Sequence, residues 1–250
     1  MDKWKGKVAV VTGASSGIGA AVVKDLANMG VNVIGLARRH EMVEEISENL
    51  KNADGKVYAR QCDISDMNSL KETFNWIGEQ FSEIHILINN AGVSTYENIL
   101  DPSDEMTRRI NNVIDTNFTG LVHCTREAFK YMKDYGIIVN VASILDSIVP
   151  FPNPSSIYPA AKHAVRAFSE IIRQELVLNG NDKIRVSNLS PGLIKTNIGR
   201  AGGHKNPDGR YELMPYLQPE EVSNAVLYLL STPYNVNISQ ITIKPVGERF

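Results

Sequence analysis

The stretch Lys7-Val-Ala-Val-Val-Thr12-Gly13-Ala-Ser-Ser-Gly17-Ile-Gly19 decides the fold of this chain. Residues 7–12 form a continuous apolar run, which is typical of a strand buried on both faces of a parallel sheet. A glycine-rich turn follows directly, then a helical pattern over residues 20–29 that ends at Gly30, then a second apolar run over residues 31–36. This order predicts an α/β protein with a doubly wound parallel sheet and helices on both faces.

The glycine-rich turn at residues 12–19 predicts a dinucleotide site. Glycines let the backbone approach a pyrophosphate closely, and the amino end of the following helix stabilises its negative charge. A glycine pattern alone is weak evidence. Its position between a strand and a helix favours dinucleotide binding over a tight turn without a ligand.

The residues after the second strand indicate which dinucleotide binds. NAD requires an acidic side chain there, which accepts hydrogen bonds from the adenosine ribose hydroxyls. The strand instead ends in Ala37-Arg38-Arg39. Because a guanidinium suits a 2′-phosphate, the sequence favours NADP; for Arg39, a simple surface charge is the alternative.

Strands and helices alternate along the rest of the chain. We expect strands at residues 56–62, 84–89, 136–142, 183–190 and 239–245, and helices at residues 41–51, 67–81, 106–133, 160–178 and 220–230. Residues 197–218 lack strong periodicity and are rich in glycine and proline, which predicts a lid or binding loop. No second core is visible, so residues 1–250 should form one Rossmann-like domain with this loop as an insertion.

Two strand ends carry further candidates for ligand binding. Asp63 stands at the carboxyl edge, where open sheets bind ligands, and could accept a hydrogen bond from an adenine amino group. A helix N-cap or a turn residue is the alternative for Asp63. Asn90-Ala91-Gly92 ends the fourth strand, and its small residues leave room for the sugar and adenine of a cofactor.

Tyr158 and Lys162 are the candidates for proton transfer. Their spacing of four places both side chains on one face of a helix. A phenol with a pKa near ~10 is a poor base at neutral pH, but a nearby ammonium favours the phenolate and lowers that pKa. The pair would then donate or accept a proton at an alcohol or carbonyl oxygen. The alternative is a half-buried aromatic residue beside a solvated lysine.

Ser143 ends a strand-like run and offers a hydroxyl group to the same substrate oxygen. Ser147 is a second hydroxyl nearby, but Ser143 follows the strand directly and is the better candidate. Between Ser143 and Tyr158, Pro150, Pro152 and Pro154 prevent a regular helix or a central strand.

The composition excludes several classes of function. The formal net charge of −2 and the absence of a basic stripe give no indication of a nucleic-acid partner. The two cysteines form no disulfide framework, and neither they nor the five histidines show metal-ligand spacing, so we expect no metal. There is no apolar run long enough to span a membrane and no signal peptide, which predicts a cytoplasmic protein.

The ordered set of motifs resembles the short-chain dehydrogenase/reductase family over essentially the whole chain. The set is Thr12-Gly-Ala-Ser-Ser-Gly-Ile-Gly19, Asn89-Asn-Ala-Gly92, Asn117, Ser143, Tyr158-Pro-Ala-Ala-Lys162 and Pro191-Gly192. Within that family, this sequence most resembles the branch that contains insect farnesol dehydrogenases and related vertebrate ketosteroid reductases. Ala37-Arg38 also occurs in that branch. The separation of Ser143 from Tyr158 is about two residues longer than the commonest family spacing.

The resemblance implies a role for each matched residue. Tyr158 would be the general acid/base, Ser143 would hold the substrate oxygen, and Lys162 would lower the tyrosine pKa and bind the nicotinamide ribose. Asn117 would hold a water molecule in a proton relay. The cofactor-binding residues would be Thr12, Gly13, Ser15, Ser16, Gly17, Ile18, Gly19, Arg38, Arg39, Asp63, Asn90, Ala91, Gly92, Tyr158, Lys162, Pro191, Gly192 and Thr196.

We expect a lipophilic substrate with one polar oxygen at the catalytic end. One wall should run from Ile144 and Leu145 to Val149 and Phe151, and it is apolar apart from Asp146 and Ser147. The loop would supply the other wall through Tyr211, Leu213, Met214, Tyr216 and Leu217. Neither segment shows a convincing cationic clamp for a carboxylate or phosphate, although Arg200, Lys205 and Arg210 lie in the loop. The alternative is that these apolar residues only pack the loop against the body.

The expected activity is NADP-dependent hydride transfer to or from an alcohol or carbonyl, with isoprenoid alcohols such as farnesol favoured. Reduction of a steroid or retinoid by the same chemistry is the alternative substrate class. A catalytically inactive NADP-binding sensor is the alternative of a different class, and the intact Ser143, Tyr158, Lys162 and Asn117 set argues against it. The resemblance also implies a homodimer or homotetramer paired through the helices at residues 106–133 and 158–178.

Overall fold

The computed structural model describes residues 2–96, 98–151 and 156–249. Seven parallel strands form one sheet in the order β3-β2-β1-β4-β5-β6-β7. The strands are β1 (Val8–Thr12), β2 (Asn32–Ala37), β3 (Val57–Gln61), β4 (Ile84–Asn89), β5 (Met132–Val141), β6 (Arg185–Pro191) and β7 (Gln240–Ile243). Because the strand order reverses between β1 and β4, a crevice for a ligand is expected at the carboxyl ends of these strands.

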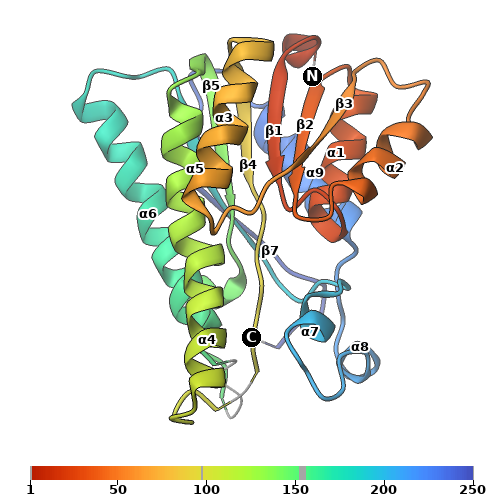
Figure 1. Cartoon of the computed structure of the whole chain (residues 1–250), viewed down its shortest axis with the longest axis vertical. Coiled ribbons are helices and arrows are strands. Elements are labelled where there is room, and N and C mark those ends of the chain that lie inside the picture. The colour runs from red at the N-terminus through yellow and green to blue at the C-terminus, as the bar shows by residue number, and fades with distance from the viewer. Residues whose placement is uncertain (1, 97, 152–155, 250) are drawn as a thin grey trace.

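The helices cover both faces of the sheet (Figure 1). They are α1 (Gly17–Asn28), α2 (Glu41–Asn49), α3 (Met67–Phe81), α4 (Asp104–Ile114), α5 (Gly120–Phe129), α6 (Tyr158–Leu178), α7 (Ile198–Ala201), α8 (Gly209–Leu213) and α9 (Pro219–Ser231). Shorter turns occur at η1 (Asp2–Trp4), η2 (Asp115–Thr119) and η3 (Ile144–Asp146). Among the described residues, no helix is both long and apolar enough to cross a bilayer.

The alternation of side chains along β1 explains the two-sided core. Ala9 and Val11 pack into a cluster with α1, α2 and α9, whereas Val8 and Val10 pack into a cluster with α3, α5 and α6. Every residue of β1 and β4 is buried, as the continuous apolar runs predict. The predicted single-domain α/β architecture is therefore confirmed.

The expected single helix over residues 106–133 is wrong. The chain forms α4, then a π-helical turn at η2, then α5, and β5 already begins at Met132. The pairing of β4 with β5 shifts between Ile84 and Ile86, and Tyr135 takes a left-handed conformation with φ of 65° before Ile137 resumes the ladder. Tertiary pairing with β4 thus overrides the helical pattern at the end of this stretch.

Residues 197–218 contain the short helices α7 and α8, which the sequence did not indicate. Both ends of this segment are fixed: Ile194 bridges to Leu217, and the Leu217 N–H donates to the Leu193 carbonyl at 2.8 Å. Pro150 lies in irregular chain, as expected, whereas Pro152 and Pro154 lie outside the described residues.

Candidate active site

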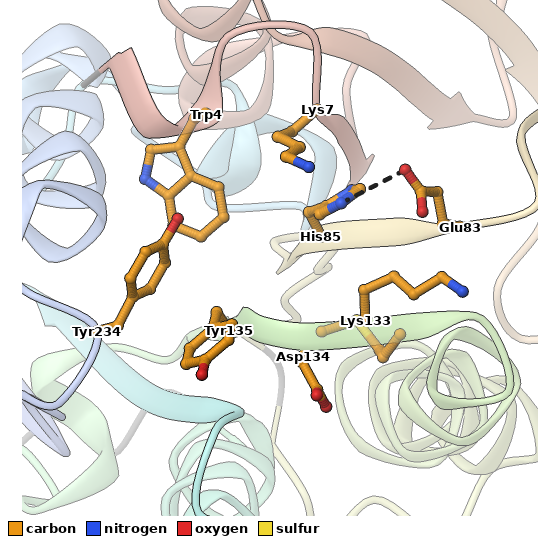
Figure 2. Close-up of a pocket in the computed structure, with 9 residues that line it drawn as sticks. Trp4, Lys7, Glu83, His85, Lys133, Asp134, Tyr135 and Tyr234 are labelled. Carbon is orange, nitrogen blue, oxygen red and sulfur yellow. Dashed lines mark ion pairs between the residues drawn. The ribbon is translucent and has the colours of Figure 1, made fainter.

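Two cavities are candidates for the functional site. One, of about 430 Å³, lies at the amino ends of β1, β4 and β5, where His85 is paired with Glu83 at 3.5 Å (Figure 2). No residue predicted to bind a ligand lines it. The other, of about 560 Å³, lies along the carboxyl ends of the strands. Open α/β sheets bind ligands at their carboxyl ends, so the second cavity is the candidate active site.

Most predicted site residues line this second cavity. They are Gly13, Ser15, Ser16, Gly17, Ile18, Arg38, Arg39, Asp63, Asn90, Ala91, Gly92, Ser143, Ile144, Leu145, Phe151, Tyr158, Lys162, Pro191, Gly192 and Thr196. Four predicted residues, Thr12, Gly19, Asn117 and Val149, do not line it. The structure therefore brings together residues that lie as far apart in sequence as Gly13 and Thr196.

The glycine-rich turn forms a tight cradle at one end of the cavity. Gly13 and Gly17 have φ angles of 66° and 56°, which favour glycine. A Cβ atom on Gly19 would lie 2.3 Å from the Gly13 carbonyl oxygen, so Gly19 is required for the turn to close. This bare backbone beside the first turn of α1 fits the pyrophosphate of a dinucleotide.

Thr12 and Asn90 support the cradle from behind. The Thr12 hydroxyl accepts hydrogen bonds from the backbone N–H groups of Asn90 and Ala91, each at 3.0 Å. The Asn90 amide donates to the Thr12 carbonyl at 3.0 Å. Thr12 is buried, so its place in the structure is to hold β1 against the end of β4 rather than to face the cavity.

Arg38, Arg39 and Asp63 lie at the adenosine end of the cavity. Both arginines are exposed, and within the described chain neither forms a hydrogen bond or an ion pair with a side chain. Asp63 is a turn residue, because its Oδ1 accepts from the Ser65 N–H at 3.0 Å and from the Ser65 hydroxyl at 2.6 Å. Asp66 is the N-cap of α3, so the alternative of an N-cap role for Asp63 is wrong.

Tyr158, Lys162 and Ser143 converge at the other end. The Lys162 Nζ lies 5.6 Å from the centroid of the Tyr158 ring and donates to the Val141 carbonyl at 2.9 Å. The Ser143 and Tyr158 side chains are hydrogen-bonded to each other. The Ser147 hydroxyl instead donates to the Ile144 carbonyl and does not line the cavity, which favours Ser143 as the group that faces a substrate.

Burial has the largest effect on the pKa values of Tyr158 and Lys162. Burial raises the pKa of Tyr158 above its usual value, while the hydrogen bond from Ser143 and the charge of Arg210 act in the opposite direction. Burial lowers the pKa of Lys162 to about 8, and the Asp146 carboxylate opposes that change. Lys162 is not among the groups that shift the Tyr158 pKa here, so its expected lowering of that pKa stays a prediction.

Asp146, the polar exception within the first expected wall, does not line the cavity. Its side chain is buried and points toward β6, where Oδ2 accepts hydrogen bonds from the Asn188 amide at 2.8 Å and from the Ser190 hydroxyl. Its Oδ1 lies 4.0 Å from the Arg166 guanidinium. The carboxylate thus ties the turn that carries Ser143 to the strand that leads to Pro191.

Asn117 lies in the π-helical turn between α4 and α5. Its Oδ1 accepts from the Val93 N–H at 2.7 Å, and its amide donates to the Val93 carbonyl at 2.8 Å. The side chain therefore fixes the segment after β4, next to Gly92 and Lys162. π-helical turns commonly mark functional positions, and this one explains why a polar residue is buried within a helical stretch.

The expected walls are only partly correct. Val149 is exposed and away from the cavity, and of the five loop residues expected to form the second wall only Met214 lines it. Leu213 is 85% exposed, Leu217 packs into the core, and the Tyr211 hydroxyl donates to the Ile194 and Thr196 carbonyls at 3.2 Å.

Several residues that line the cavity were not among the predicted site residues. They are Val93, Ser94, Tyr96, His204 and Glu248, and Arg210, which was not expected to act as a clamp, lines it too. Glu248 comes from the last residues of the chain, and its Oε1 accepts from the Leu193 N–H at 2.8 Å. Val93, Ser94 and Tyr96 follow the predicted Asn90-Ala91-Gly92 motif closely, which could have indicated them. His204, Arg210 and Glu248 reach the site only through contacts between distant segments.

Comparison with known proteins agrees with this arrangement. A family model described as short chain dehydrogenase matches residues 7–206. Farnesol dehydrogenase of Aedes aegypti is 42% identical, and the alignment covers 100% of both chains. Dehydrogenase/reductase SDR family member 11 of Bos taurus is 37% identical, with 99% of each chain covered. A solved structure of serine dehydrogenase in its closed form, complexed with NADP+, has a TM-score of 0.86 at 30% identity and covers 97% of this chain and 96% of that chain.

Proposed function

The chain belongs to the short-chain dehydrogenase family of oxidoreductases, and we propose that it transfers a hydride between NADP(H) and a lipophilic alcohol or carbonyl compound. The observation that carries this proposal is that one cavity has the glycine cradle and Arg38 at one end and Ser143, Tyr158 and Lys162 at the other. The relative bound to NADP+ and the two guanidinium groups after β2 support the choice of cofactor.

In this reaction the cofactor and the protein residues have separate roles. Bound NADP(H) supplies the hydride donor or acceptor, and the protein positions it and manages one proton. Ser143 orients the substrate oxygen, and Tyr158 exchanges a proton with that oxygen. Lys162 and the π-helical turn around Asn117 lie behind Tyr158. A water-mediated relay through them would carry the proton between Tyr158 and solvent.

We further propose that the substrate is an isoprenoid alcohol such as farnesol, with steroids and retinoids as the alternative. The relative from Aedes aegypti supports this choice, and so do Ile144, Leu145, Ile198 and Met214, which present apolar surface to the cavity. Each methylene group buried there should add about 0.8 kcal/mol of binding free energy.

A spectrophotometric assay tests this function. The purified protein is incubated with NADP+ or NADPH and a panel of primary and secondary alcohols, isoprenoid alcohols, steroids and ketones, and nicotinamide absorbance is followed. We expect kcat/KM to rise with chain length. A flat response to chain length would reject the lipophilic site, and no turnover of any compound by cofactor-bound protein would favour the sensor alternative.

Self-association through α4, α5 and α6 is also part of the proposal. Ile114, Phe129, Ile171, Val177 and Leu178 leave large apolar side chains exposed on these helices. A homodimer or homotetramer would bury them. Light scattering after size-exclusion chromatography measures the mass directly, and a monomer at micromolar concentration would reject this part.

A further inference from the structure

Arg210 faces the reaction end of the cavity, and among the described residues it has no acidic partner. It lies in α8 and lines the cavity together with Tyr96 and His204. Its Nη1 donates to the Tyr96 hydroxyl at 3.2 Å, and its Nη2 donates to the Tyr211 hydroxyl at 3.0 Å. Its Nε is buried and has no hydrogen-bond partner within the described chain.

The surroundings hold the guanidinium in place rather than neutralise it. A Cβ atom on Gly199 would lie 2.7 Å from Arg210 Nη2, so the glycine makes room for this side chain. The neighbouring Arg200 behaves differently, because it points to solvent and pairs with Asp208 at 2.5 Å. In the described parts of the chain no carboxylate lies within ion-pair distance of Arg210.

Two other charged groups that line this cavity have hydrogen-bond partners in the protein, although Oε2 of Glu248 is buried without one among the described residues. Lys162 donates to the Val141 carbonyl, and one oxygen of Glu248 accepts from the Leu193 N–H. Arg210 is close enough to Tyr158 for its charge to lower the pKa of the phenol, and Tyr96 acts on the same phenol in the opposite direction. Tyr158 and Arg210 line the same cavity of about 560 Å³, so one small molecule could place an oxygen at Tyr158 and a second polar group at Arg210.

We propose that Arg210 binds a carboxylate, so that the site accepts hydroxy acids and oxo acids with an apolar chain in addition to isoprenoid alcohols, and prefers each acid to its neutral analogue. A partly buried guanidinium that lines a cavity and has no acidic partner among the described residues is suited to a planar anion, which its Nη groups would contact. Tyr96 and Tyr211 fix its orientation, and the apolar surface from Ile144, Leu145 and Met214 would receive the chain. This inference rests on the proposed hydride transfer.

The reaction balances without a further reactant. The hydroxy acid loses its carbinol hydrogen as hydride to NADP+ and its hydroxyl proton through Tyr158 to solvent. The products are the oxo acid, NADPH and one proton, and the carboxylate is unchanged.

The test compares β-hydroxydecanoate with its neutral methyl ester, which has the same carbinol carbon. We expect the wild type to prefer the acid by about 10- to 100-fold in kcat/KM, the range that a hydrogen bond to a charged group typically supports. Arg210→Gln also removes a charge that acts on Tyr158, so the readout is the ratio of the kcat/KM values for acid and ester, which should fall to about one. Arg210→Lys should retain part of the preference, because the charge remains but the planar fork is lost.

Arg200→Gln is the matched control, since Arg200 lies in the same segment but does not line the cavity. It should keep the wild-type ratio of acid to ester. Equal losses on acid and ester in Arg210→Gln would show that Arg210 only supports the loop, and that result would overturn the proposal. So would a wild-type preference for the ester.

Calorimetry separates this proposal from the proposed function. With NADP+ present, decanoate should bind the wild type more tightly than decanamide, and Arg210→Gln should remove the difference. If no alcohol is turned over, the proposed function fails, yet this measurement still decides the role of Arg210. Weaker NADPH binding by Arg210→Gln, with no change in decanoate binding, would assign Arg210 to the cofactor and overturn the inference.

Discussion

At the level of single residues, burial of Lys162 lowers the stability of the folded protein by an amount that depends on pH. It is 3% exposed, and burial lowers its pKa from 10.5 to about 8. Because the folded value is the lower one, the unfolded chain binds more protons between these two values. The destabilisation is largest below the pKa of the folded state, where the buried lysine is charged. It disappears as the pH rises toward the pKa of the unfolded state. We therefore expect the free energy of unfolding of the wild type, relative to Lys162→Met, to rise with pH across this window. Denaturant melts at several pH values measure it, and parallel curves would contradict it.

The charge of Asp146 affects the pKa values of the two proposed catalytic groups. Its carboxylate raises the pKa of both Lys162 and Tyr158, so Asp146→Asn should lower both values. We expect the pH profile of kcat/KM to move to lower pH. Asn188→Ser is the control, because it removes a 2.8 Å hydrogen bond to Asp146 and keeps the charge. It should cost about 1–3 kcal/mol of stability without moving the profile. An unmoved profile in Asp146→Asn would show that the carboxylate is only structural.

At the level of elements, the π-helical turn couples α4 and α5 to the segment after β4. Asn117→Ala removes both hydrogen bonds to Val93 and should cost about 1–3 kcal/mol of stability. Hydrogen exchange at the Val93 amide should increase, and cofactor binding should weaken because Gly92 lines the cavity. Asn112→Ala, one turn earlier and exposed, is the control. Unchanged exchange at Val93 would show that the turn does not hold this segment.

The elements also show what a sequence can and cannot predict. The apolar runs of β1 and β4 and the helical pattern of α3 are local, and their positions were predicted closely. The π-helical turn and the early start of β5 depend on pairing with Val93 and Ile84, which are distant in sequence. The helices α7 and α8 are four and five residues long, too short for a periodic pattern to appear.

At the level of the whole molecule, the cavity spans the sheet from β2 to β6, so a bound cofactor should stabilise the entire fold. A ligand at 100 times its Kd adds roughly 2.7 kcal/mol. We expect NADPH to raise the melting temperature more than NADH at equal concentration. Arg38→Asp should remove or reverse this difference, whereas Arg39→Asp should largely keep it. Loss of the difference only in Arg39→Asp would assign the 2′-phosphate contact to Arg39.

The site as a whole was predictable where its chemistry lies in short motifs. The glycine turn, Ser143 and the Tyr158–Lys162 pair were all predicted, and they line one cavity. Thr12 and Gly19 do not line it and instead support the turn. The residues that surround the substrate were not, because Tyr96, Arg210 and Glu248 come from three separate segments with no shared pattern. The direction of the Asp146 side chain was not predictable, because it depends on hydrogen bonds to Asn188 and Ser190 on β6.

Transfer of deuterium tests the central proposal most directly. The protein is given NADP+ and either farnesol or β-hydroxydecanoate deuterated at the carbinol carbon, and the NADPH formed is analysed by mass spectrometry. We predict one deuterium in the product NADPH. Tyr158→Phe should bind NADPH as the wild type does but transfer the label about 10²- to 10⁴-fold more slowly. Cofactor-bound wild type that transfers no label from either compound, or Tyr158→Phe that transfers it within a few-fold of the wild-type rate, would contradict the account.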